Sequence, residues 1–109
     1  ARWLLRGLRA SLVTSATVAN RQVHLVVDDG ATQLADLPAL GVQAASLTRN
    51  YDALVGLSAP VAVDSEIYIS APSDLILEAG YRLRTVTTNL QVGDDWTAPV
   101  LYVEDWQIP

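Results

Sequence analysis

The one side chain suited to general-base chemistry near neutral pH is His24, the only histidine in the sequence. It stands between Val23 and Leu25 in a run of alternating apolar residues, which is typical of a strand. A serine or threonine nucleophile needs an adjacent base, and the chain has neither Lys nor Cys to replace the histidine. We therefore expect no catalytic residues and no enzyme activity.

Three pairs of neighbouring acidic residues suggest carboxylate chemistry instead. Glycoside hydrolysis needs two carboxyl groups on either side of the bond that breaks. Neighbours in a strand point to opposite faces, which separates Glu104 from Asp105. The pairs Asp28-Asp29 and Asp94-Asp95 fall where turns are expected, and Asp is common in turns because it binds nearby backbone groups. A carboxylate enzyme is therefore disfavoured.

Acidic loop residues are also the usual ligands of Ca²⁺. The candidates are Asp64-Ser65-Glu66 and Asp94-Asp95, and neither matches a calcium-loop motif. One His and no Cys leave zinc and redox metals without their usual ligands. We expect neither a metal nor another cofactor.

The chain has three Trp and four Tyr residues but no Phe. Flat rings beside acidic groups suit sugar recognition, and Trp96 directly follows Asp94 and Asp95 in an expected loop. These three are the candidate ligand-loop residues of a lectin-like module. Aromatic residues in a sandwich are more often core or subunit-contact residues, and both interpretations stay open.

All seven basic residues are Arg. Protein interfaces favour Arg, Trp and Tyr over Lys, although a genome of high GC content would also favour Arg. Only 17% of the residues are charged, against about 25% in an average soluble domain. We therefore expect some apolar surface to meet a partner. The candidate partner-interface residues are Arg2, Trp3, Arg6, Arg9, Arg82, Arg84 and Trp106.

The net charge of −5 disfavours other partners. A negative protein repels phosphate backbones and anionic lipid headgroups, so neither nucleic acid nor a membrane is expected. No stretch approaches the roughly 20 consecutive apolar residues of a membrane-spanning helix.

Alternating apolar runs separated by turn residues predict an all-β chain. No linker or repeat interrupts them, so residues 1–109 are expected to form a single domain. Gly7 is expected to mark a bulge, and Asp29-Gly30 a tight hairpin turn of type I′. Residues 61–64 are expected to form a loop. Strands are predicted over residues 3–14, 21–28, 32–37, 45–53, 66–70, 75–77, 81–91 and 100–106.

About eight strands of this kind suit an antiparallel two-sheet β-sandwich of the jelly-roll type. An immunoglobulin-like sandwich predicts nearly the same pattern of strands and stays open as the alternative.

Several stretches share a texture and a turn placement that extend over most of the chain: Trp3-Leu4-Leu5-Arg6, residues 12–21 (LVTSATVANR), residues 77–91 (LEAGYRLRTVTTNLQ), Gly93-Asp94-Asp95-Trp96 and residues 101–106 (LYVEDW). In these features the chain resembles the small jelly-roll proteins encoded among bacteriophage virion structural genes. The resemblance implies a virion component without catalytic residues.

Within that family the resemblance favours a capsid decoration or cement protein, which binds the capsid exterior and stabilises the shell. The resemblance then implies synthesis in the host cytoplasm and a place in the virion. It implies contacts with the major capsid protein or other virion subunits, and a homo-oligomer in which a trimer is favoured. Tail, collar or fibre components, and a glycan-binding module, are the alternatives.

Overall fold

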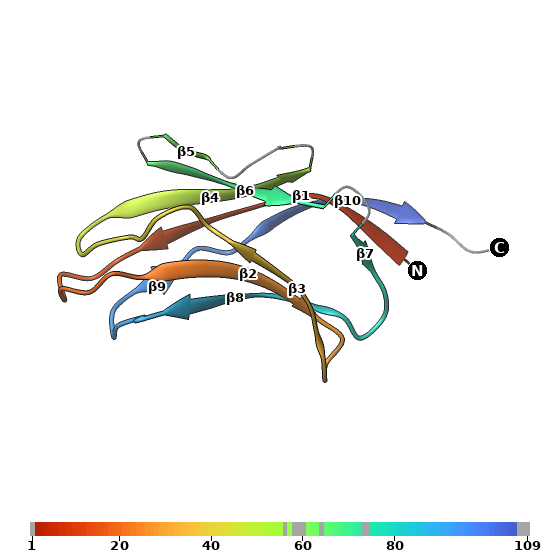
Figure 1. Ribbon diagram of the computed structural model, residues 1–109, viewed down its shortest axis with the longest axis horizontal. Coiled ribbons are helices and arrows are strands. Elements are labelled where there is room, and N and C mark those ends of the chain that lie inside the picture. Colours follow the sequence, from red (N-terminus) through yellow and green to blue (C-terminus); the bar gives the residue numbers. More distant parts are fainter. Residues whose placement is uncertain (1, 56, 58–60, 64, 73–74, 107–109) are drawn as a thin grey trace.

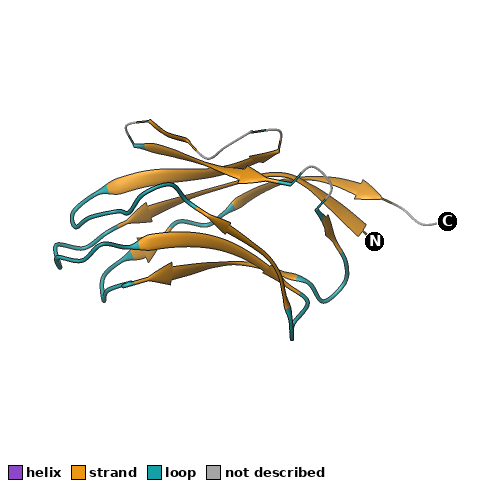
Figure 2. Ribbon diagram, in the orientation of Figure 1, coloured by secondary structure: helices purple, strands orange, loops and turns teal. Residues whose placement is uncertain are grey.

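The computed structural model describes residues 2–55, 57, 61–63, 65–72 and 75–106. In this part of the chain, all of the regular secondary structure is β-strand (Figure 2). The strands are β1 (Arg2–Val13), β2 (Gln22–Asp28), β3 (Gln33–Pro38), β4 (Thr48–Val55), β5 (Val61–Val63), β6 (Glu66–Ala71), β7 (Ile76–Leu77), β8 (Arg82–Thr88), β9 (Asp95–Trp96) and β10 (Val100–Trp106).

The strands form two sheets, so the predicted all-β class is confirmed. The larger, seven-stranded sheet has the order β10-β1-β4-β6-β5, with β7 and β9 also paired to β1. The smaller sheet has the order β3-β2-β8 and faces the larger one (Figure 1). The first and last strands are neighbours, because β1 pairs with β10.

Purely antiparallel pairing was expected, and this is wrong for one pair of strands. β4 and β6 are parallel, with Tyr51 beside Ile67 and Ala53 beside Ile69. The chain between them includes β5, which pairs antiparallel with β6. Side chains alternate in the same way in parallel and antiparallel strands, so the sequence pattern does not encode the direction of pairing.

Each of the eight predicted runs overlaps a strand of the structure. β5 and β9 were not predicted, and β5 occupies residues 61–63, where a loop was expected. These strands have three and two residues, which is too short for alternation to reveal them. β8 ends at Thr88, earlier than predicted, where Asn89 takes a positive φ of 58°.

The predicted bulge at Gly7 is confirmed. Leu5 pairs with Val103 and Gly7 with Tyr102, which leaves Arg6 as an extra residue on β1. Gly7 also fits a close approach, because a Cβ there would lie 3.3 Å from the backbone oxygen of Ala53. The bulge explains why Arg6 breaks the alternation of β1.

The hairpin between β2 and β3 is confirmed, but its turn is longer than the predicted two residues. Four residues, 29–32, connect the strands. Gly30 has a φ of 97°, and its N–H donates to Asp28 Oδ1 at 2.8 Å. The carboxylate of Asp29 accepts from the N–H groups of Ala31 and Thr32. These local hydrogen bonds stabilise a wider loop than a type I′ turn.

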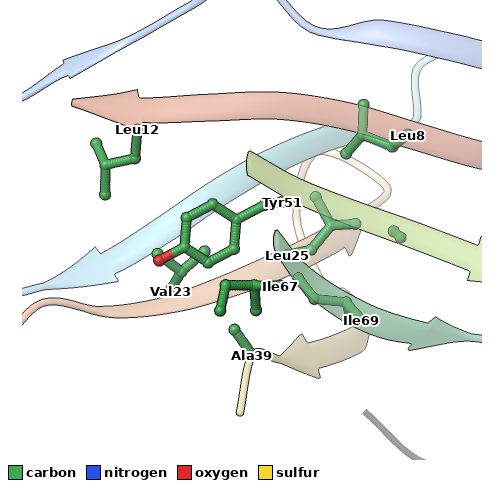
Figure 3. Close-up of a cluster of buried hydrophobic side chains, with 9 residues drawn as sticks. Leu8, Leu12, Val23, Leu25, Ala39, Tyr51, Ile67 and Ile69 are labelled. Atoms are coloured by element: carbon green, nitrogen blue, oxygen red, sulfur yellow. The ribbon is translucent and has the colours of Figure 1, made fainter. Parts of the chain in front are cut away.

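The hydrophobic core lies between the two sheets (Figure 3). Apolar side chains on the inner face of β1, β4 and β6 pack against those of β2, and their removal from water stabilises the sandwich. Ile67 and Ile69 point inward, as predicted from their alternation. The buried cluster comprises Leu8, Leu12, Val23, Leu25, Ala39, Tyr51, Ala53, Ile67 and Ile69.

Candidate functional site

One side of the sandwich ends in two strand edges that no described strand covers. Among the described strands, β8 pairs only with β2 and β10 only with β1. The edge of each strand that faces away from its partner therefore presents backbone N–H and C=O groups to a further chain. We call the region between these two edges the open side, defined by β8, β10 and the apolar residues between them.

Two hollows lie along the open side, and they share Leu83 of β8 and Leu101 of β10. The first has a volume of about 210 Å³ and continues inward to Leu8 and Leu25. The second is lined by Trp3, Leu77 and Tyr81, among others. The shared residues join the hollows into one apolar groove between the sheets.

Trp96 forms part of the floor of this groove. Its ring lies 5.5 Å from that of Tyr51, at an interplanar angle of 59°. The hydroxyl of Tyr51 donates to Gln43 Oε1 at 2.8 Å, and burial raises the pKa of Tyr51 to about 12. Trp96 is therefore held by the core and supports the groove from beneath.

Two arginines stand beside the groove on the outer surface of β8. Arg82 Nε lies 2.8 Å from Asp28 Oδ1, and Arg84 Nε lies 2.6 Å from Asp28 Oδ2. The hydrogen bonds from Arg82 and Arg84 hold the pKa of the nearly buried Asp28 carboxyl well below its usual range. One carboxylate between two guanidinium groups leaves this edge with a net positive charge.

A second polar cluster lies on the outer face of the larger sheet. Arg9 Nη1 lies 3.1 Å from both oxygens of Asp52, and Arg9 Nη2 lies 3.4 Å from Glu66 Oε1. Burial raises the pKa of Asp52, whereas the amide of Asn50 lowers that of Glu66. Arg9 thus ties β1 to β4 and β6, next to the exposed ion pair of Arg6 with Glu104.

A third charged cluster lies among the loops at one end of the sandwich. The Arg21 guanidinium binds both carboxylate oxygens of Asp94, at 2.9 and 3.0 Å. Arg21 also donates to the backbone oxygens of Ala19 and Thr17. Neither side chain of the ion pair is exposed to solvent. The pair joins the loop after β1 to the loop before β9.

The proposed sugar-binding residues do not share one hollow. Asp94 is buried against Arg21, while Trp96 lines the groove of the open side without Asp94 or Asp95. Asp64, a calcium candidate, lies outside the described residues. Within the described part of the chain, no group of three or more His, Asp or Glu side chains is placed to hold a metal ion.

The interface residues expected from the sequence fall into two groups. Trp3 and Arg84 line the open side, and Arg82 stands next to Arg84. Arg6 and Arg9 lie with their acidic partners on the larger sheet. The structure places the backbone of Arg2 in β1 and that of Trp106 in β10, and their side chains are outside the described part.

Sequence reasoning offered these arginines as candidate partner-interface residues and missed their partners within the chain. Asp28 was grouped with the turn acids at the end of the predicted strand over residues 21–28, and its place directly opposite Arg82 was missed. The available signal was the alternation of side chains within β2 and β8, since it places Asp28 and Arg82 on the same face of the sheet once the two strands are paired. The buried ion pair of Arg21 with Asp94 could not be found in this way, because neither strand alternation nor sequence spacing connects the two residues.

Comparison with known proteins gave no match to a protein family model, to a curated protein or to a solved structure. In the described residues, there is no helix with the length and apolar character needed to cross a membrane.

Proposed function

We propose that this protein is a non-enzymatic structural component of a bacteriophage virion. In this proposal it is a capsid decoration or cement protein that binds the exterior of the capsid and stabilises the shell through contact area. Its partners are the major capsid protein or other virion subunits and further copies of itself. The jelly-roll type is part of the proposal, with the parallel pair of β4 and β6 as a departure from it.

The observation that carries the proposal is the exposed apolar run on β10. Val100, Leu101 and Tyr102 are consecutive, with exposures of 51%, 39% and 60%. Consecutive exposed apolar residues on an uncovered strand edge favour association with another chain. The resemblance to virion structural proteins supplies the class of assembly.

The larger sheet offers a separate surface for the shell. Tyr102 and Leu54 flank Gly7 on its outer face, since an ideal Cβ at Gly7 would lie 3.4 Å from one side chain and 3.6 Å from the other. Arg6 and Arg9 lie nearby on the same sheet. A mixture of apolar and arginine side chains of this kind is typical of protein interfaces.

Self-association belongs to the proposal as well. Identical subunits usually form closed, symmetric assemblies. The resemblance favours a trimer, whereas the two free strand edges of the open side favour a pair of copies.

The proposal is tested by sedimenting the purified protein with phage particles that lack it. Co-sedimentation is expected, and Leu54→Glu should weaken it, because a charge replaces an apolar group on the docking face. Val92→Glu, in an exposed loop, is the matched control and should bind like the natural chain. Retention on a glycan array without binding to particles would favour the lectin-like alternative. Binding confined to tails would favour a tail, collar or fibre component.

A further inference from the structure

We infer that the open side is closed by a second copy of this chain, with β8 of each copy pairing antiparallel with β10 of the other. This deepens the self-association in the proposed function and names its surface. Two such pairings related by one two-fold axis would merge the sheets of both copies and cover both apolar grooves.

The directions of the two strands permit this arrangement. β8 runs from the hollow at Tyr81 towards the hollow at Thr85. β10 runs the opposite way, since it begins after Pro99 of the first hollow and ends near Asp105, which pairs with Trp3 of the second. Figure 1 shows the two arrows pointing in opposite directions. A two-fold axis parallel to the strands keeps these directions, so β8 meets the partner's strand β10 antiparallel.

The charges of the two edges favour this pairing over the pairing of like strands. β8 carries Arg82 and Arg84, which share the single carboxylate of Asp28. β10 carries Glu104, which also accepts a hydrogen bond from Arg6 at 2.8 Å, and Asp105. Antiparallel pairing of β8 with β8 over its full length would place the Arg84 residues of both copies diagonally across from each other, and the same pairing of β10 would do so for Glu104. Unlike strands instead place opposite charges side by side, which is the arrangement favoured across interfaces.

One register of β8 against the partner's strand β10 gives favourable neighbours on the outer face of the joined sheet. It sets Arg82 opposite the partner's Glu104, Arg84 opposite the partner's Tyr102 and Val86 opposite the partner's Val100. An arginine over a tyrosine ring adds a cation–π contact. Each of these side chains is exposed in the single copy. In this register each would gain a neighbour from the partner on the outer face of the joined sheet.

The same register places mostly apolar side chains opposite each other on the inner face of the joined sheet. It sets Leu83 opposite the partner's Val103 and Thr85 opposite the partner's Leu101, within the two grooves. Leu83, Thr85 and Leu101 already line one hollow, so the two strands lie at the same level along the open side. Burial of the exposed Leu101 and of the groove would supply the hydrophobic driving force.

The first test is the molar mass of the natural chain, by size exclusion with light scattering. We expect twice the 11.7 kDa of the chain. A monomer at tens of micromolar, or a trimer, would overturn the pairing. Binding to phage particles is measured separately, so a monomer that still binds particles overturns the pairing and leaves the proposed function standing.

The second test uses the absence of cysteine from the sequence. Opposed residues of paired strands have Cβ atoms close enough for a disulfide to form. We expect Val86→Cys and Val100→Cys chains to cross-link under mild oxidation when mixed, and neither variant to cross-link alone. Val92→Cys, mixed with either, is the control for random collision. A cross-link in a single variant, or none in the mixture, would contradict the pairing of β8 with β10.

Discussion

Arg21 and Asp94 lie 73 positions apart in the sequence and form a bidentate ion pair from which solvent is excluded. Backbone N–H groups of Ser15 and Gln91 also donate to the Asp94 carboxylate. The pair therefore connects two loops that have no strand pairing with each other. Its full set of partners lets two charges be buried without an unsatisfied group.

Replacing Asp94 by Asn should destabilise the fold, because the Arg21 guanidinium would stay buried without a counter-charge. We expect the melting temperature, measured by circular dichroism, to fall by about 10 °C or more. Asp36→Asn is the control, since its contact with His24 is partly exposed and exposed pairs contribute little. Equal losses in the two variants would show that burial of the pair is not what matters.

Stability should fall in acid. Hydrogen bonds from arginines hold the pKa values of Asp28 and Asp94 below the ordinary 3.8. Their stabilisation is present above that value and is lost as the pH falls through the lower pKa values of the folded state. Asp52 has the opposite effect on the pH dependence of stability: burial raises its pKa, so protonation of this carboxyl group favours the folded state.

We therefore expect a steady melting temperature between about pH 7 and 5 and a decline below about pH 4. Asp28→Asn should reduce the steepness of that decline, because it removes one of the carboxyl groups whose pKa is lowered in the folded state. A melting temperature that rises between pH 5 and 3 would mean that Asp52 outweighs these groups.

The hairpin loop depends on Gly30. Its φ of 97° is in a region that side chains rarely adopt. We expect Gly30→Val to lower the free energy of unfolding by about 1 kcal/mol or more. Gly30→Asn should lose less, because Asn tolerates positive φ. If urea unfolding gave the same midpoint for Val and for Gly, the described conformation of this loop would be wrong.

Chelation is expected to leave the fold intact, because Asp94 already binds Arg21 and no calcium-loop motif is present. The measurement is the melting temperature in excess EDTA, compared with the same sample after addition of Ca²⁺. A large loss in EDTA that Ca²⁺ restores would show a metal site that the turn acids form after all.

The inward-facing residues could be predicted from the sequence, and the pairing of the strands could not. Alternation located Ile67 and Ile69 in the core, because burial and period follow from the same geometry. It gave no information on whether β6 runs parallel or antiparallel to β4. That direction depends on the chain connection, which is a property of the whole fold.

The candidate site was only partly predictable for a similar reason. Arg82 and Arg84 were assigned to one face of a strand, and the structure puts them there. That Asp28 lies opposite them follows from the pairing of β8 with β2, which joins distant segments. The open side is a relationship between two strand edges, and no local sequence pattern encodes it.

The central claim is that the protein stabilises a viral shell by contact. The most direct measurement heats phage particles that lack the protein, with and without the purified chain, and follows the temperature at which they are disrupted and release their genome. We predict that the added chain binds and raises this temperature, and that Leu54→Glu raises it less. An unchanged release temperature at concentrations that saturate binding, or no binding at all, would contradict the claim.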